Sequence, residues 1–129
     1  MVSRIFVNLP VKDLKRSIDF FTKLGFTFEP KFTDEKATCM IIGENMFAML
    51  LVEKFFKTFT PKEICDSNEH TEVITALQVD SRQAVDDLMA KALAAGASSP
   101  MPKQEMPGMY GSNFTDLDGH MWELFYMEG

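Results

Sequence analysis

One order of secondary-structure elements occurs twice along this chain, and the repeat limits the folds open to it. In the first half, alternating apolar residues predict a strand over 5–11, and a helix then begins after Asp13 and ends at Gly25. Strands over 26–32, 37–42 and 46–52 are expected to follow. The second half predicts a strand over 72–79, a helix between Ser81 and Gly96, irregular strand-like segments over 98–115 and a last strand over 120–127.

The two copies align at nearly constant spacing. Val79 follows Val11 by 68 residues, and Met121-Trp122 follows Met46-Phe47 by 75. A unit of roughly 50 residues cannot bury its own apolar face, so we expect the 129 residues to form one domain with pseudo-two-fold symmetry. Module one covers about 1–53, a linker about 54–71, and module two about 72–129.

The linker carries three phenylalanines and the pattern of a short helix. Phe55, Phe56 and Phe59 either pack on the domain edge, cover a pocket as a lid, or form a dimer contact. Thr60-Pro61-Lys62-Glu63 has a capping box with proline at the first helical position, which predicts a short helix through Ile64.

Composition excludes several kinds of partner and site. With 13 basic and 19 acidic residues the net charge is -6, which argues against nucleic acid. No apolar run approaches the ~20 residues of a membrane span, and the first residues lack the apolar core of a signal peptide, so we expect a cytoplasmic protein without a membrane partner. Cys39 and Cys65 are then expected to be reduced thiols. Two histidines exclude a site built from several imidazoles; His70 is expected at the surface and His120 at a solvent-facing turn.

Two motifs and the repeat together resemble one superfamily. The first motif is VKDLKRSIDFFTKLGF over 11–26, and the second is DLDGHMWEL over 116–124. With both modules present, nearly the whole chain resembles the vicinal oxygen chelate superfamily, which holds glyoxalase I (lactoylglutathione lyase), bleomycin-binding (bleomycin resistance) proteins, fosfomycin-resistance transferases and extradiol dioxygenases. The resemblance implies an α+β fold of two βαβββ modules. Their strands form an open, curled mixed sheet that binds small molecules, with helices on the outer face.

The resemblance also implies where a metal would be held. Enzymes of this superfamily bind one divalent metal through up to four inward-pointing His, Gln or Glu residues, and the metal stabilises an oxyanion as a Lewis acid. The matching positions here are Phe6, Ala48 (or Leu50, if the turn lengths differ by two), Ile74 and Glu123. Glu123 is the only retained ligand type, and catalytic sites need about three protein ligands. We therefore expect no metal cofactor; the alternative is Zn, Ni, Fe or Mn held by displaced ligands.

Glu123 is the candidate catalytic residue. It lies in an apolar strand with Met121 and Phe125 on the same face, which suits a general acid or base, a counter-charge for a cationic ligand, or an inherited residue without chemistry. Strand alternation places Asn8 and Gln78 on the side of Phe6 and Ile74. The full set of expected ligand-binding residues is Phe6, Asn8, Ala48, Ile74, Gln78, Tyr110, Ser112, Met121 and Phe125.

Three functions remain open from the sequence. The first is a small-molecule-binding module that has lost the usual metal site. The second is a metal-dependent lyase or dioxygenase of the lactoylglutathione lyase type with displaced ligands, so the sequence leaves open whether the protein is an enzyme. The third is a non-catalytic interaction subunit that acts through its dimer surface. The resemblance implies a homodimer in each case.

Overall fold

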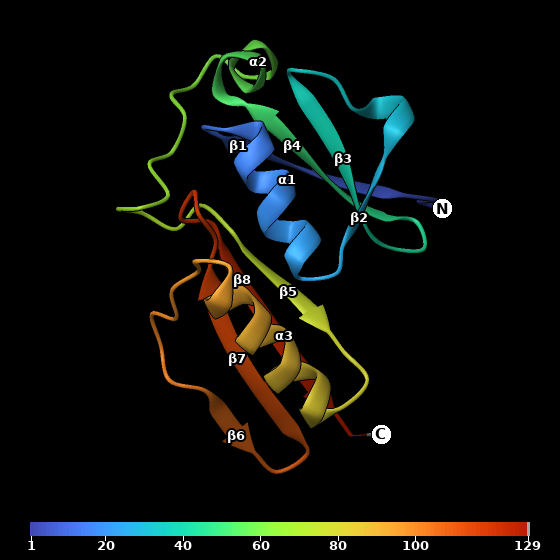
Figure 1. Cartoon of the computed structure of the whole chain (residues 1–129), viewed down its shortest axis with the longest axis vertical. Helices are drawn as coiled ribbons and strands as arrows, with labels where there is room; N and C mark the ends of the chain where they lie inside the picture. Colours follow the sequence, from blue (N-terminus) through green and yellow to red (C-terminus); the bar gives the residue numbers. More distant parts are fainter. Residues whose placement is uncertain (129) are drawn as a thin grey trace. The chain divides into compact units, whose positions relative to one another are not determined.

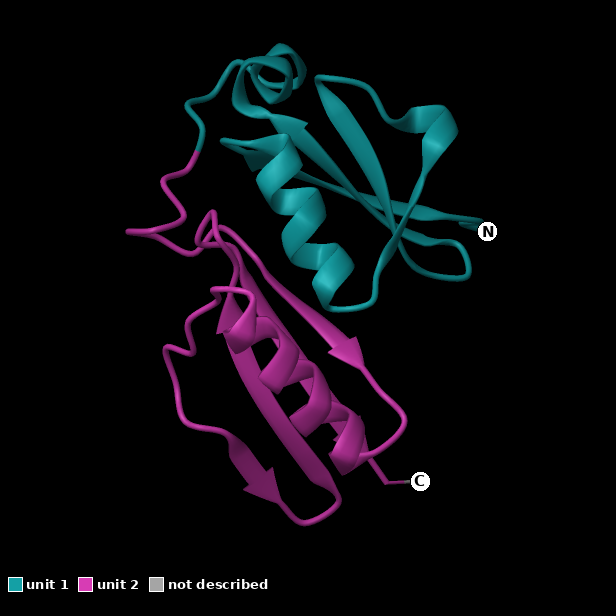
Figure 2. Cartoon of the chain, viewed as in Figure 1, with its two compact units in different colours: residues 1–64 teal, residues 65–129 magenta. Residues whose placement is uncertain are grey.

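The computed structural model describes residues 1–128, and the chain divides into two compact units, residues 1–64 and 65–129 (Figure 2). The boundary between the units falls inside the predicted linker. None of the helices within residues 1–128 has both the length and the apolar character needed to cross a membrane.

Unit 1 is a four-stranded mixed sheet with a helix on one face (Figure 1). The strand order is β1-β4-β3-β2, with β1 parallel to β4 and the other neighbours antiparallel. The elements are β1 (Ile5–Val11), α1 (Leu14–Lys23), β2 (Thr27–Glu29), the 3-10 turn η1 (Pro30–Phe32), β3 (Ala37–Gly43), β4 (Met46–Val52), the short helix α2 (Glu53–Phe56) and the 3-10 turn η2 (Lys57–Phe59).

Unit 2 repeats this topology. Its strand order is β5-β8-β7-β6, again with the outer parallel pair β5 and β8 and antiparallel neighbours elsewhere. The elements are β5 (Ile74–Gln78), α3 (Arg82–Ala94), β6 (Gln104–Met106), β7 (Met109–Thr115) and β8 (Met121–Met127). The expected α+β fold of two βαβββ modules is confirmed.

Local sequence signals explain the two long helices. Asp13 and Ser81 cap α1 and α3 by accepting hydrogen bonds from the backbone N–H groups of Arg16 and Ala84. The buried side of α1 carries Leu14, Ser17, Phe20 and Phe21, and that of α3 carries Val85, Met89 and Ala92. This spacing gives each helix one apolar face, and that face packs on its own sheet.

Two short elements differ from the sequence prediction. The strand expected over 26–32 ends at Glu29, because Pro30 opens a 3-10 turn instead of extending the sheet. The helix predicted through Ile64 is absent: residues 60–64 are not helical, and the helical turns precede them, over residues 53–59. Thr60 does accept a hydrogen bond from the Lys62 backbone N–H, but this closes a turn that no helix continues.

Each sheet has one face against its helix and one opposite face, which we call the open face. In unit 1, Leu9, Ala48 and Leu50 lie on the helix side and are buried. Phe6 and Phe47 are paired in register on the open face and stack with ring centroids 4.8 Å apart. Phe6 is 46% exposed, whereas Ala48 is 1% exposed.

The strand register corrects the alignment of the two modules. Phe6 pairs with Phe47 in unit 1, and Ile74 pairs with Met121 in unit 2, so β4 and β8 correspond at a spacing of 74 residues when β1 and β5 correspond at 68. The similar pairs Met46-Phe47 and Met121-Trp122 gave the spacing of 75, which is one residue too long. A slip of one residue moves every side chain to the other face of a strand. The counterpart of Glu123 is therefore Met49, on the open face, and not Ala48.

Candidate functional site

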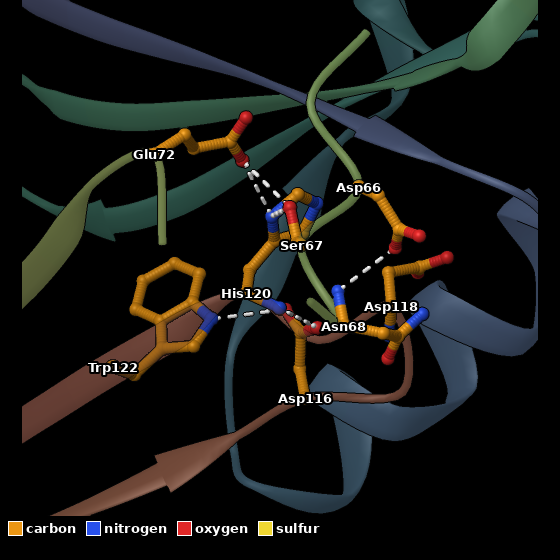
Figure 3. Close-up of polar contacts among 8 residues, drawn as sticks. All are labelled: Asp66, Ser67, Asn68, Glu72, Asp116, Asp118, His120 and Trp122. Carbon is orange, nitrogen blue, oxygen red and sulfur yellow. Dashed lines mark hydrogen bonds and ion pairs between the residues drawn. The ribbon is translucent and has the colours of Figure 1, made fainter. Parts of the chain in front are cut away.

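A tight turn between β7 and β8 fixes the beginning of the strand that carries Glu123. The buried carboxylate of Asp116 accepts hydrogen bonds from the backbone N–H groups of Asp118 and His120, at 2.9 and 3.0 Å, and from Trp122 Nε1 at 2.9 Å (Figure 3). Burial raises the pKa of Asp116, although these three donors and the nearby imidazole of His120 oppose the rise. The Asp-Gly turn is thus closed by hydrogen bonds to a buried carboxylate.

His120 ties this turn to the segment that precedes β5. Its ring nitrogen Nδ1 lies 2.8 Å from Glu72 Oε1 and 3.2 Å from Ser67 Oγ, and the residue is 4% exposed (Figure 3). The expectation that His120 faces solvent is therefore wrong, because Glu72 and Ser67 contact its ring and the residue itself is buried. Serine and glutamate meet the same ring nitrogen, whereas a nucleophilic relay needs them on opposite nitrogens. The contact therefore has a structural role: it holds the segment before β5 against the turn before β8.

The open face of unit 2 gathers most of the predicted residues of that module. Register places Ile74 beside Met121, Ala76 beside Glu123, and Gln78 beside Phe125. Asn113 of β7 lies across from Glu123 on its other side. Glu123 carries the only charge among the residues that the strands of unit 2 present on this face, the others being Ile74, Ala76, Gln78, Gln104, Met106, Met109, Gly111, Asn113, Thr115, Met121, Phe125 and Met127.

Two hollows lie along β8, one lined by Glu123 and the other by Met121. The smaller one, which contains Glu123 and Asn113, measures about 10 Å³ and is bordered by Met109 and Phe125. The larger one measures about 310 Å³; Met121 lies at its β8 side, and Met101 and His70 also line it. His70 is exposed, as expected. Glu123 thus lies in the smaller hollow, and the wider one is lined by Met101, Met121 and several polar side chains, Glu69 among them.

Three predicted ligand-binding residues do not belong to an open face. Ala48 is buried on the helix side of unit 1. Tyr110 is buried on the helix side of unit 2, where its hydroxyl donates to Asp86 Oδ1 at 2.5 Å. Ser112 borders the smaller hollow, but it pairs with the buried Leu124, so alternation directs its side chain to the helix side. Phe6 and Asn8 lie on the open face of unit 1, and both are exposed.

Sequence reasoning missed Asn113. A signal was available, because Gly111, Asn113 and Thr115 alternate along β7 and the antiparallel partner of that strand carries Glu123. The exact pairing of Asn113 with Glu123 depends on where the turn over residues 116–119 closes. The sequence pattern does not specify that position.

The donor set was tested against the divalent metal that the superfamily implies. With the corrected register the four positions carry Phe6, Met49, Ile74 and Glu123, which are two hydrocarbon side chains, a thioether and one carboxylate. Within residues 1–128, no group of three or more His, Cys, Asp or Glu side chains is arranged to hold a metal ion. Zn, Ni and Fe sites need about three imidazole, thiolate or carboxylate ligands, so these residues do not fit such a metal.

Comparison with known proteins decides the family. Residues 4–43 match the family model of the bleomycin resistance protein-like N-terminal region. A glyoxalase/bleomycin resistance protein/dioxygenase family enzyme of Burkholderia phytofirmans has the same fold, with a TM-score of 0.81 and 17% identity over 95% of this chain and 97% of that one. The chain belongs to the vicinal oxygen chelate superfamily. The resemblance read from its motifs is confirmed.

Other solved structures match over nearly their full length. The hypothetical protein SA1046 from S. aureus is 30% identical, with a TM-score of 0.82 and coverage of 98% of this chain and 95% of that one. The fosfomycin resistance protein FosX from Listeria monocytogenes shares the fold at 20% identity and a TM-score of 0.72, over 99% and 96% of the two chains. A comparison with curated proteins gives no match.

Proposed function

We propose that this member of the superfamily is a small-molecule-binding module that works without a divalent metal at the usual position. The observation that carries the proposal is the composition of the open faces. Glu123 is the one ligand-type residue at the four positions, and apolar or thioether side chains stand at the other three. On the open face of unit 2, Glu123 beside Ile74 and Met121 suits a ligand with an apolar part and a charged group.

The dimensions of unit 2 support this function. The larger hollow, of about 310 Å³, is at the lower end of the volumes that hold small organic ligands. Met101 and Met121 give it flexible, polarizable walls, which accommodate ligands of irregular shape. Glu123 is the only charge among the strand residues of this face, and Glu69 adds a second carboxylate to the lining of the larger hollow, so the expected ligand has an apolar part and a cationic group. The net charge of -6 also favours the approach of a cation.

We also propose that the protein acts in the cytoplasm as a homodimer. Cys39 and Cys65 are both unpaired, as expected for reduced thiols. Ile5, Phe6 and Met46 lie at one end of the β1–β4 pair and are each about half exposed, which is typical of a surface that contacts a partner.

Two measurements test the binding function. The purified protein is incubated with Zn, Ni, Fe or Mn and desalted, and its metal content is measured; we expect retention far below one ion per chain. Stoichiometric retention that Glu123→Ala abolishes and Glu128→Ala preserves would refute the proposal and favour a metal-dependent lyase or dioxygenase. Glu128 is a suitable control because it is exposed and follows the end of β8.

The second measurement is a thermal-shift panel of apolar molecules that differ only in the charge of one group. We expect cationic members to raise the melting temperature more than neutral or anionic ones. The preference should disappear in Glu123→Gln and remain in Glu128→Gln. A panel in which no member binds would contradict the function.

A further inference from the structure

One buried oxygen beside Glu123 has no hydrogen-bond partner. Asn113 is 6% exposed, and its side-chain oxygen Oδ1 is buried without a donor. Leaving a buried acceptor unpaired costs about 1–3 kcal/mol, so groups of this kind call for an explanation in function. The backbone carbonyl of Asn113, in contrast, accepts a hydrogen bond from Ser99 Oγ at 2.9 Å.

The surroundings of this oxygen contain acceptors but no cation. Asn113 and Glu123 are direct cross-strand partners, and both line the smaller hollow. Among the other residues that line it, Gln104 carries an amide and Ser112 a hydroxyl, and none is Lys, Arg or His. The Asn113 oxygen has no donor within hydrogen-bond distance, and an ionised Glu123 only accepts, so a ligand with N–H groups can supply donors to both.

The size of the hollow limits what can supply those donors. About 10 Å³ accommodates one water-sized group, such as a single nitrogen with its hydrogens, and not the body of a ligand. Met109 and Phe125 at its border offer an apolar contact to whatever carries the head group.

From these contacts we infer that the smaller hollow receives one N–H-bearing nitrogen of a cationic head group: that of a primary ammonium, or the leading nitrogen of an amidinium or a guanidinium. Glu123 compensates the positive charge and Asn113 Oδ1 accepts an N–H. This inference rests on the proposed function and adds Asn113 as the residue that separates N–H cations from cations without hydrogen-bond donors.

A set of phenyl compounds of similar size distinguishes the two interactions. Benzamidine offers charge and N–H donors, phenyltrimethylammonium offers charge alone, and benzoate has the opposite charge. Binding of each is measured by calorimetry to the wild type and to Asn113→Leu, Asn113→Asp and Glu123→Gln. The matched controls are Gln83→Leu, which replaces an exposed amide on α3, and Glu128→Gln.

We expect Glu123→Gln to weaken both cations about 10-fold, because both lose the counter-charge. Asn113→Leu should weaken benzamidine about 5- to 10-fold and leave phenyltrimethylammonium unchanged. It should also raise the melting temperature of the free protein by about 3 °C, because an unpaired buried acceptor is removed. Asn113→Asp keeps the acceptor and should bind benzamidine more tightly than the wild type, so the inference stays testable if the leucine variant folds poorly.

The outcomes separate this inference from the proposed function. If both cations bind the wild type equally and Asn113→Leu weakens neither selectively, the role of Asn113 is wrong while metal-free binding at Glu123 stands. If neither cation binds and metal is retained through Glu123, the proposed function itself fails. A lower melting temperature in Asn113→Leu, with benzamidine affinity unchanged, would show that the oxygen has a structural partner and would overturn the inference.

Discussion

At the residue scale, the most informative side chain outside the open face is Asp116, a buried carboxylate that stabilises the turn before β8. Its two oxygens accept from two backbone N–H groups and from Trp122 Nε1. In Asp116→Asn the carboxylate is replaced by an amide, whose NH₂ group must meet one of these donors. We expect the free energy of unfolding to fall by about 2–3 kcal/mol in urea denaturation. A loss below about 0.5 kcal/mol would contradict a tightly bonded turn.

The pKa of Asp116 gives this residue a pH dependence opposite to that of most surface carboxylates. Burial raises the folded-state pKa above the ordinary value of 3.8, so between these two values the folded state binds more protons than the unfolded state. The contribution of Asp116 to stability is therefore greatest below the unfolded pKa and decreases as pH rises toward the folded pKa. Urea unfolding across this range should show wild-type stability falling relative to Asp116→Asn. A difference that increases with pH would contradict the assignment.

At the element scale, the turn at Gly119 holds the segment before β5 against the start of β8. Gly119 has φ of +85°, and a Cβ there would lie 2.7 Å from Asn68 Oδ1 and 2.9 Å from the Ser67 carbonyl. Gly119→Ala should therefore cost about 3 kcal/mol, from backbone strain plus displacement of residues 67–68. Gly108→Ala is the matched control, because φ is +79° but no atom lies within 4 Å, so strain alone should cost about 1 kcal/mol.

Chemical denaturation measures both glycine variants, and amide exchange of residues 66–72 reports where the structure loosens. Faster exchange there in Gly119→Ala, but not in Gly108→Ala, is the expected pattern. Equal losses of stability in the two variants would mean that the contact with Ser67 and Asn68 contributes nothing.

The elements also show how far sequence signals reach. Asp13 and Ser81 gave both long helices their starting points, because capping and apolar spacing act within a few residues. The capping pattern at Thr60 failed, since four residues of local preference cannot stabilise a helix that has no face to bury. His120 was misplaced for the opposite reason: its partners, Ser67 and Glu72, are about 50 residues away in the sequence, and no local pattern indicates them.

At the scale of the whole molecule, the repeated order of elements predicted the family. Which residues occupy the site, however, changes when the alignment of the two modules shifts by one residue. Glu123 and the apolar character of its counterparts follow from the motif and the repeat. Met49, not Ala48, is the counterpart of Glu123 because the connection between β7 and β8 closes one residue differently from the assumed alignment. Asn113 enters the site through antiparallel pairing, which no repeat within the sequence encodes.

The distribution of apolar surface leads to a prediction about assembly. Ile5 and Met46 are register partners at one end of β1 and β4, and with Phe6 they expose about half of their area. Burial of these neighbouring apolar side chains against a second copy would stabilise a dimer, so we expect a homodimer with twice the chain mass of 14.7 kDa by light scattering. Met46→Lys should shift the mass toward that of the monomer, because a charge cannot be buried there without a partner. Phe59→Lys is the control. Phe59 is 61% exposed and lies on η2, outside β1 and β4. Dissociation by Phe59→Lys alone would instead place the contact on the segment of residues 55–59, and a wild-type monomer at every concentration would exclude the dimer.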